Sequence, residues 1–339
     1  MGITIKDVAA KAGLSVSTVS KVFNHYADIS PETKELVMEV AQSIGYYPNA
    51  TARALKTNRS YNLGFLFDEN ASSGITHPFF AEVINAFKNE CESRGYDMTF
   101  INRNVGQTQM SYLNHCRYRN VDGVCLAGVD FFSREIHDLI YSDVPSVSID
   151  HVFETRPSVV SENTRGIQEL TEFAIQRGHT RIAYIHGETT SSVTRHRITG
   201  FYRTMTAHSL PVPPEYFLEG KYLDSRRCRE LVLNLLSLPE PPTFILLPDD
   251  VSYLGAIEAA NIKGRIIGQD ISFAGYDGIQ MIQYLKPKLT TIRQNTEEMG
   301  KKAADLLIDM IEQPNTAGSE ITYITGKLLE GKTVAVLNG

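Results

Sequence analysis

The stretch "TIKDVAAKAGLSVSTVSKVFN", residues 4–24, contains start and end signals for two short helices. Thr4 can cap the first helix together with Asp7, three residues later, and Gly13 ends its apolar pattern. Ser15 is a favourable cap for the second helix. The stretch therefore predicts two short helices joined by a tight turn.

The second helix is predicted to have two unlike faces. Its apolar face consists of Val19, Val22 and Phe23. The opposite face carries small or basic side chains, namely Val16, Ser17, Ser20 and Lys21. Such a face can approach base edges in a major groove, where Lys21 can reach guanine acceptors or a phosphate.

A third helix is predicted to begin with Ser30 as its cap and Pro31 as its first residue, and to end at Gly45. Its apolar residues are Leu36, Val37, Val40 and Ile44. Two short helices braced by a third are typical of a helix-turn-helix, whose second helix reads DNA. A small helical bundle with a solvated face is the alternative, because such patterns also arise by chance.

The segment "NATARALKTN", residues 49–58, predicts a helix too short to be stable alone in water. Leu55 could act as an apolar wedge between base steps in the minor groove, with Arg53 and Lys56 on neighbouring phosphates or base edges. The alternative is a linker helix that packs Leu55 onto its own domain.

The composition is that of a globular, multidomain protein. The chain has 339 residues, of which 42% are hydrophobic and 21% charged, and this length predicts two or three domains. No run approaches the ~20 apolar residues of a membrane span, and no apolar signal segment opens the sequence, so we expect a cytoplasmic protein. The four cysteines lack the spacing of a zinc site or disulfide frame.

The charge is unevenly distributed. The net charge of the whole chain is −6, but residues 1–60 hold seven Lys and Arg against five Asp and Glu. This asymmetry is weak support for an N-terminal DNA-binding domain.

From residue 61 onward, short apolar runs alternate with helical stretches, which predicts α/β structure with parallel sheets. The expected strands are residues 62–67, 97–102, 121–127, 145–150, 180–186, 243–248 and 271–276. This part is long enough for two sheets, and open α/β sheets bind ligands beyond the carboxyl ends of their strands.

The residues that follow these strands are mostly acidic or polar: Asp68, Asn102, Arg103, Asp130, Asp150, His151, His186, Asp249, Asp250 and Asp277. Carboxylates converging on one cleft suit a sugar, because each can accept hydroxyl hydrogens while Phe79 or Phe131 stacks on the ring. Arg197 is the expected fork-shaped donor to ligand oxygens. An Asp after a strand is, however, often only a helix cap.

One nucleotide-binding pattern is rejected. "GKLLEGKT", residues 326–333, has the spacing of a phosphate-binding loop. The strand-like "VAVLNG" follows it, whereas such a loop must lead into a helix. The sequence also lacks the hydrolase elbow, the metalloprotease motif and the dinucleotide fingerprint. We therefore predict a protein that is not an enzyme and has no cofactor and no metal.

The chain resembles the lac repressor family of bacterial regulators over nearly its whole length. The resemblance is carried by residues 4–24 and 30–57 and by "HPFFAEVINAF", "VDGVCLAG", "RGHTRIAYI", "RITGF", "DDVSYLGA", "ISFAGYDG" and "LTTIRQNTEEMG". It implies an all-α helix-turn-helix headpiece and an α/β core of two doubly wound parallel-sheet subdomains, like periplasmic binding proteins. The expected boundaries are 1–47 for the headpiece, 48–60 for the hinge, and 61–161 with 292–321 and 162–291 with 322–339 for the subdomains.

The resemblance also implies a homodimer that binds a near-palindromic operator, with the hinge helices ordering on DNA and Leu55 opening the central base step. The base-reading positions fall on Val16, Ser17 and Lys21, where relatives commonly have Arg in place of Lys21. The full set of predicted DNA-binding residues is Thr4, Ser15, Val16, Ser17, Thr18, Ser20, Lys21, Asn24, Tyr47, Asn49, Ala52, Arg53, Leu55 and Lys56.

A small effector is expected in the cleft between the subdomains. The predicted effector-binding residues are His77, Phe79, Phe131, Asp150, His151, Arg197, Asp250 and Asp277. This chain departs from relatives at Glu162, at Asp249 and in its "YDG" at residues 276–278, and we expect these changes to add negative charge near the cleft. They disfavour a strongly anionic effector and leave a neutral sugar or an amine-bearing ligand open.

The leading interpretation is a repressor of carbohydrate-utilisation genes whose affinity for operator DNA is controlled by a sugar. Two other classes stay open at this point. A periplasmic sugar-binding sensor would have the same α/β part without DNA function, and an α/β enzyme would need an acid-base pair. No heptad repeat closes the sequence, so a dimer is the expected assembly.

Overall fold

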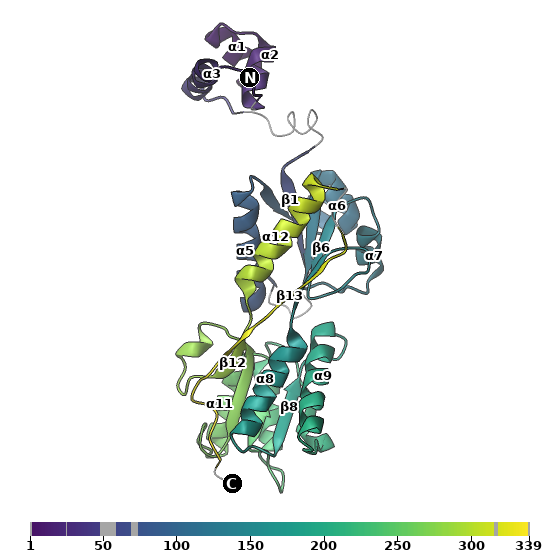
Figure 1. Cartoon of the computed structure of the whole chain (residues 1–339), viewed down its shortest axis with the longest axis vertical. Coiled ribbons are helices and arrows are strands. Elements are labelled where there is room, and N and C mark those ends of the chain that lie inside the picture. Colours follow the sequence, from purple (N-terminus) through teal and green to yellow (C-terminus); the bar gives the residue numbers. More distant parts are fainter. Residues whose placement is uncertain (1, 25, 48–58, 69–73, 315–317, 338–339) are drawn as a thin grey trace. The chain divides into compact units, whose positions relative to one another are not determined.

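A computed structural model describes residues 2–24, 26–47, 59–68, 74–314 and 318–337. The chain divides into two compact units, residues 1–62 with 120–122 and residues 63–119 with 123–339. The described helices of the first unit are α1 (Ile5–Ala12), α2 (Val16–Phe23) and α3 (Pro31–Ile44). The second unit contains two six-stranded sheets with helices packed on them (Figure 1).

The three N-terminal helices begin at the predicted residues, and α1 and α3 end at the predicted glycines. The Thr4 backbone N–H donates to the Asp7 carboxylate at 2.8 Å. Ser15 Oγ accepts the Thr18 N–H at 3.0 Å and caps α2. Gly13 follows α1 with a φ of 67°, a left-handed conformation that glycine adopts without steric cost.

A small apolar core holds these helices together. Its fully or nearly buried members are Val8, Ala9, Val19, Val22, Val37 and Ala41. Leu36 is 42% exposed, although the sequence placed it among the apolar residues of α3. The buried stripe of α3 runs through Val37 and Ala41 at a spacing of four residues, and Leu36 lies beside this stripe.

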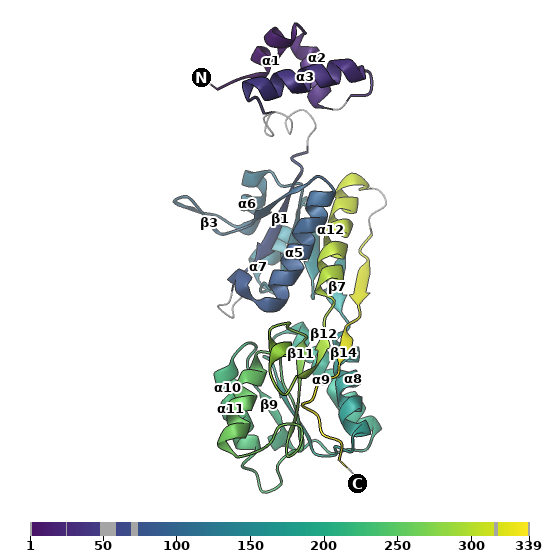
Figure 2. The same ribbon diagram turned by 90° about the vertical axis from the view of Figure 1, so that its left-hand side faces the viewer.

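The first sheet has the strand order β13-β7-β6-β5-β1-β2. Its strands are β1 (Asn62–Phe67), β2 (Asp97–Phe100), β5 (Gly123–Ala127), β6 (Ser146–Ile149), β7 (Ser158–Ser161) and β13 (Ile321–Ile324). Helices α5 (Pro78–Ser93) and α12 (Thr296–Glu312) pack against each other, as do α6 (Tyr112–Arg119) and α7 (Arg134–Ile140) (Figure 2). We call the first sheet with these four helices the first subdomain.

The second sheet has the order β14-β12-β11-β10-β8-β9. Its strands are β8 (Ile182–His186), β9 (Phe217–Glu219), β10 (Phe244–Leu246), β11 (Ser272–Asp277), β12 (Thr290–Arg293) and β14 (Lys327–Leu329). The last of these is antiparallel to β12. Helices α8 (Asn163–Gln176) and α9 (Ser192–Ala207) form one pair and α10 (Ser225–Leu235) and α11 (Ser252–Ile262) another. We call the second sheet with these four helices the second subdomain.

Successive residues of the central strands β8 and β11 pack into the two hydrophobic cores on opposite faces of the second sheet. In β8, Tyr184 packs with the α8 and α9 side, whereas Ile185 packs with the α10 and α11 side. In β11, Ala274 and Phe273 divide in the same way. Both faces are therefore covered, which explains why these strands read as continuous apolar runs.

The chain crosses between the subdomains at three places: from β7 into α8, from β12 into α12, and from β13 into β14. The third crossing joins the first through the Glu162 N–H, which donates to the Ile324 carbonyl at 3.0 Å. The expected exchanges near residues 292 and 321 fall slightly later, because Arg293 still belongs to the second sheet and Ile324 to the first.

Several short strands were not predicted. They are β7, β9, β12, β14 and the hairpin of β3 (Asn104–Val105) and β4 (Thr108–Gln109). The expected strand "VAVLNG" is wrong for its described part, because residues 334–337 are not in a strand. The Leu337 N–H instead donates to the Arg177 carbonyl at 2.8 Å, while β14 lies within the pattern that mimics a phosphate loop.

Two expectations from composition can be compared with the structure. Cys91, Cys116, Cys125 and Cys228 are all buried and free. Within the described part of the chain, no helix is both long enough and apolar enough to span a bilayer.

The contact between α5 and α12 depends on a glycine. A Cβ atom on Gly300 would lie 2.3 Å from the Val83 carbonyl oxygen and 2.7 Å from the Ala86 Cβ. Gly300→Ala should therefore destabilise the first subdomain by about 1–3 kcal/mol, even though alanine is the better helix former. The measurement is the shift of the urea midpoint of the full chain. Lys301→Ala, on the exposed side of α12, is the control, and equal midpoints for the two variants would contradict the close packing.

Candidate functional site: the α2 face and the cavity

The exposed face of α2 contains the residues expected to read DNA. Val16 is 41% exposed, Ser17 is exposed, and Ser20 and Lys21 are half-buried. Val19 and Val22, on the other side of the helix, are buried in the helical core. The face therefore has the small, polar character that insertion into a major groove requires.

Other predicted DNA-binding residues have structural contacts in the headpiece. The hydroxyls of Ser15 and Thr18 are hydrogen-bonded at 2.9 Å, and Asn24 Nδ2 donates to the Ser20 carbonyl at 2.6 Å. Thr4 caps α1, and Tyr47 is 85% exposed. The remaining predicted residues, Asn49, Ala52, Arg53, Leu55 and Lys56, lie outside the described residues.

A cavity of about 490 Å³ lies at the carboxyl ends of the strands of both sheets. From the first subdomain, its lining includes a group of aromatic and imidazole rings, called here the aromatic wall, with the carboxyls of Asp130 and Asp150 beside it; the rings are those of His77, Phe79, Phe80, Phe131, Phe132 and His151. From the second subdomain and the crossings, the lining is mostly polar and includes Glu188, Ser192, Arg197, Tyr222, Asp277 and Gln294. A cavity with one apolar wall and a few convergent polar groups is the usual form of a small-molecule site.

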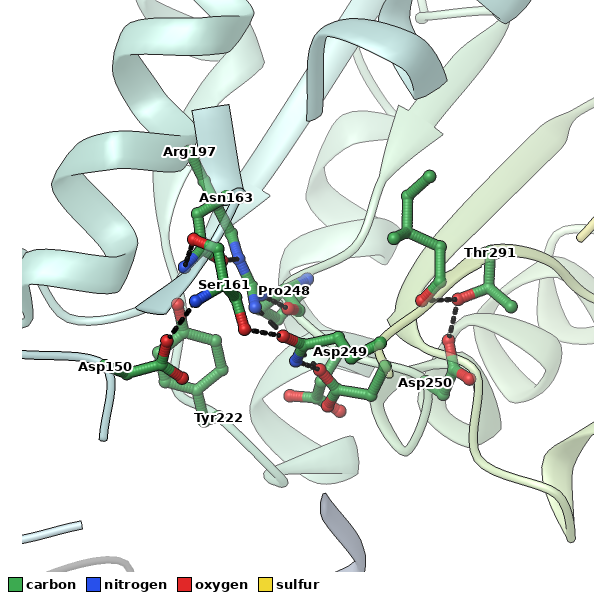
Figure 3. A network of polar contacts seen from close by, with 12 residues as sticks. Asp150, Ser161, Asn163, Arg197, Tyr222, Pro248, Asp249, Asp250 and Thr291 are labelled. Carbon is green, nitrogen blue, oxygen red and sulfur yellow. Dashed lines mark hydrogen bonds and ion pairs between the residues drawn. The ribbon is translucent and has the colours of Figure 1, made fainter. Parts of the chain in front are cut away.

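Seven of the eight predicted effector residues line this cavity, and Asp250 does not. Asp250 is fully buried, and its carboxylate accepts the Ile279 N–H at 2.7 Å and the Thr291 hydroxyl at 2.6 Å. Figure 3 shows Asp250 and Thr291 on the opposite side of the polar network from Asp150. The Asp250 side chain lies against Gly275, where a Cβ would be only 2.3 Å from Asp250 Oδ1.

Glu162 and Asp249, where we expected added negative charge near the cleft, do not line the cavity. Glu162 accepts a hydrogen bond from Thr325 and is paired with Arg165. Asp249 is buried and accepts backbone N–H groups of Leu223 and Ser252, each at 2.8 Å. These carboxylates are therefore structural. Negative charge in the lining comes instead from residues 130, 150, 188 and 277.

Among the residues that the structure describes, Arg197 is the only Lys or Arg that lines the cavity, and its side chain is 4% exposed. Its Nε donates to Asn163 Oδ1 at 2.8 Å and its Nη1 to the Pro248 carbonyl at 3.1 Å (Figure 3). The guanidinium lies 3.6 Å from the centre of the Tyr276 ring, a cation–π contact. These contacts use two of its five N–H groups, so a ligand can take others.

Two carboxylates lie beside this guanidinium. Asp277 Oδ1 is 3.8 Å from Arg197 Nη2 and accepts the Gln294 Nε2–H at 2.8 Å. Asp150 Oδ1 accepts the Ser161 N–H at 2.8 Å. Burial raises the pKa of Asp150, and it raises the pKa of Asp277 to about 7. Near neutral pH, the Asp277 carboxyl can thus either accept or donate a hydrogen bond.

Both residues have unusual backbone conformations. The φ of Asp150 is 57° and that of Asp277 is 105°. A positive φ is uncommon in residues with a side chain, and such strain tends to cluster at ligand sites. Each residue stands at the end of a strand, and each lines the cavity.

The aromatic wall is uncharged. The rings of Phe131 and His151 are stacked, with centroids 4.4 Å apart and an interplanar angle of 4°. Burial lowers the pKa of His151 to about 4, and that of His77 also to about 4. At neutral pH both imidazoles are neutral, so this wall offers flat apolar faces to a ligand.

Sequence reasoning missed several lining residues, notably Phe80, Tyr222 and Gln294. Tyr222 follows the three-residue strand β9, which is too short to show a pattern. Gln294 could have been found, because it follows "TTIR", residues 290–293, a run rich in β-branched residues that forms β12. Among the described residues, no group of three or more His, Cys, Asp or Glu could hold a metal ion.

Comparison with known proteins agrees with this architecture. The family model of lacI-type bacterial regulatory proteins matches residues 4–49, and that of the periplasmic binding protein-like domain matches residues 171–334. The transcriptional repressor PurR of Vibrio cholerae serotype O1 is 32% identical over 317 residues, which cover 91% of each chain. The chain therefore belongs to the lacI family of bacterial regulatory proteins and is a DNA-binding transcriptional regulator.

Solved structures show the same fold. The lac repressor dimer bound to operator and the anti-inducer ONPF superposes with a TM-score of 0.83 at 23% identity, covering 99% of this chain and 100% of that one. A putative ribose operon repressor from Burkholderia thailandensis gives a TM-score of 0.68 at 26% identity, covering 80% and 99%. The predicted helix-turn-helix and α/β fold is thus confirmed, and a sensor without a DNA-binding domain is excluded.

The raised pKa of Asp277 predicts a pH-dependent stability. Because its pKa is about 7 in the folded chain and ~3.9 when unfolded, the folded state binds more protons between these values. This carboxyl therefore destabilises the fold increasingly as pH rises from about 4 to about 7.

Asp277→Asn cannot ionise, so its stability relative to the parent should increase from pH 5 to pH 8, by an amount on the order of a few kcal/mol. Thermal unfolding of both proteins at the two pH values measures this difference. Asp130→Asn, at the exposed rim, is the control, and a difference that does not change with pH would show that Asp277 titrates normally.

Proposed function

We propose that this member of the lacI family is a cytoplasmic, homodimeric repressor whose operator affinity is controlled by a neutral sugar or sugar derivative in the cavity. The proposal rests on one observation. The lining of the cavity combines aromatic side chains with a buried guanidinium and two carboxyls. We assign the protein no catalytic activity. Its role is to couple ligand binding at this cavity to DNA binding through the headpiece.

DNA recognition is assigned to the exposed face of α2. The helix is held by α1 and α3 through a core of six buried side chains, and its outward residues are small or cationic. We place Val16, Ser17 and Lys21 on base edges and the caps of the helices near phosphates. Leu55, with Arg53 and Lys56, completes the interface from the minor groove.

A sugar fits the cavity better than an anion does. The lining contains four acidic side chains and a single guanidinium among its described residues, and its two histidines are neutral at pH 7. A phosphate or carboxylate would therefore meet net repulsion, whereas hydroxyl groups can donate to Asp150 and accept from Arg197. The name of the putative ribose operon repressor, whose fold this chain shares, is further support.

The same groups connect the ligand to the subdomain crossings. Asp150 is bonded to Ser161 in the first crossing, and Asp277 to Gln294 in the second. Ser161 Oγ also donates to Gln294 Oε1 at 2.5 Å. A ligand can make different contacts with these groups when the cleft is open and when it is closed. It then shifts the population of the two states, by no more than the difference between its affinities for them.

The ligand assignment is tested by a thermal-shift screen against monosaccharides, disaccharides and aryl glycosides, with sugar phosphates as the anionic comparison. A ligand that binds the folded state raises the apparent unfolding temperature with concentration. We expect neutral sugars to give shifts and sugar phosphates none. Stabilisation by phosphates alone would reverse the assignment.

Asp150→Asn keeps an acceptor for Ser161 and removes one charged acceptor for a ligand hydroxyl. Because a hydrogen bond to a charged group contributes ~1.5–3 kcal/mol, the affinity for the sugar found in the screen should fall about 10- to 100-fold. Titration calorimetry measures this change. Glu188→Gln, at the exposed rim of the cavity, should retain affinity within about threefold, and an equal loss in both variants would refute the role of Asp150.

Leu55→Ala separates the two functions. An apolar wedge that is buried only in the DNA complex contributes ~1.5–3 kcal/mol, so operator affinity should fall at least about 10-fold while sugar affinity is unchanged. Gel shift and calorimetry measure the two quantities. Unchanged operator binding would instead favour an ordinary linker helix at residues 49–58.

A further inference from the structure

The lysine of the DNA-reading helix is already paired in the headpiece. Lys21 Nζ lies 2.6 Å from Asp28 Oδ2, and the two side chains are 40% and 55% exposed. Asp28 belongs to the turn between α2 and α3. The hydrogen bond to Asp28 raises the pKa of Lys21, and the same bond lowers the pKa of Asp28. Both groups are thus fully charged at neutral pH.

Few described cations lie near this pair. Lys21 is the only Lys or Arg in α2, and among the described residues Lys34 is a second cation that influences Asp28. Residues 1–47 contain four Lys and five Asp or Glu in total. A headpiece with a net charge of −1 has little general attraction for DNA. Whether Lys21 is paired with Asp28 therefore has a large effect on which DNA the headpiece binds.

A carboxylate and a phosphate compete for an ammonium group on similar terms. Each offers a charged oxygen, so moving Lys21 from Asp28 to a phosphate exchanges one ion pair for another and leaves Asp28 uncompensated beside the DNA backbone. A guanine edge offers two acceptors, O6 and N7, and lies away from the phosphates. Asp28 therefore opposes phosphate contacts of Lys21 more than it opposes base contacts.

We propose that Asp28 is a specificity-determining residue, which holds Lys21 away from phosphates and so lowers the affinity for non-operator DNA more than the affinity for the operator. This inference rests on the proposed role of α2 in reading DNA. Asp28 is a positioning residue in this scheme, because it acts through Lys21 and contacts no base itself.

The test compares the parent chain with Asp28→Asn on two duplexes of equal composition. One is the duplex recovered by in vitro selection with the full-length parent, and the other is its scrambled sequence. In Asp28→Asn, we expect affinity for the scrambled duplex to rise about 3- to 10-fold and affinity for the selected duplex to rise less than about twofold. The slope of log affinity against log salt on the scrambled duplex should steepen by ~0.9 for each freed lysine.

Matched variants separate this effect from simple charge and from folding. Glu39→Gln, on the exposed side of α3, removes the same charge without touching Lys21 and should leave the specificity ratio unchanged. Asp28→Glu keeps the charge and should keep the parent ratio. In a Lys21→Met background, Asp28→Asn should no longer change binding to the scrambled duplex.

Two results would overturn the inference. One is a specificity ratio that Asp28→Asn leaves unchanged although the parent discriminates, as after an equal gain on both duplexes. The other is a gain on the scrambled duplex that persists without the lysine. If the parent itself fails to distinguish the two duplexes, the proposed DNA-reading role of α2 is wrong, and the role of Asp28 fails with it. Thermal unfolding of each variant confirms that the headpiece is folded.

Discussion

A buried guanidinium organises the α/β part of the molecule. A charge removed from water must be compensated by nearby dipoles or opposite charges, and Arg197 obtains this compensation from α8, from the segment after β10 and from β11. Those elements are far apart in the sequence, so the requirement brings their ends to one point. The carboxyl group of Asp277 and the ring of Tyr276 are placed in the same way, and the cavity forms where these groups meet.

The same polar groups connect the cavity to the crossings between the subdomains. Asp150 and Asp277 are each bonded to a residue where the chain passes between subdomains, and these two residues, Ser161 and Gln294, are bonded to one another. A change in the partner of either carboxyl must therefore alter hydrogen bonds within the crossings. In the proposed function, the ligand is therefore coupled to the subdomain geometry by short-range contacts rather than by distant charges.

The sequence predicts local features well and non-local ones less well. Ser15 and Gly13 act through groups a few residues away, so their roles in starting and ending helices could be predicted from spacing alone. Asp150 and Asp250 both follow apolar strands and look equivalent in the sequence. Only the path of the backbone distinguishes them, because one is turned toward the cavity and the other is enclosed beside Gly275.

The order of elements along the chain affects how the protein is synthesised. The first subdomain is completed by α12 and β13, which follow the entire second sheet except β14. A nascent chain that stops before residue 296 would leave α5 without its helical partner and β7 as an unpaired edge, a surface prone to aggregation. The three N-terminal helices, by contrast, have a core of their own. During translation the DNA-reading helices can therefore form long before the sensor, and interrupted translation would separate the two.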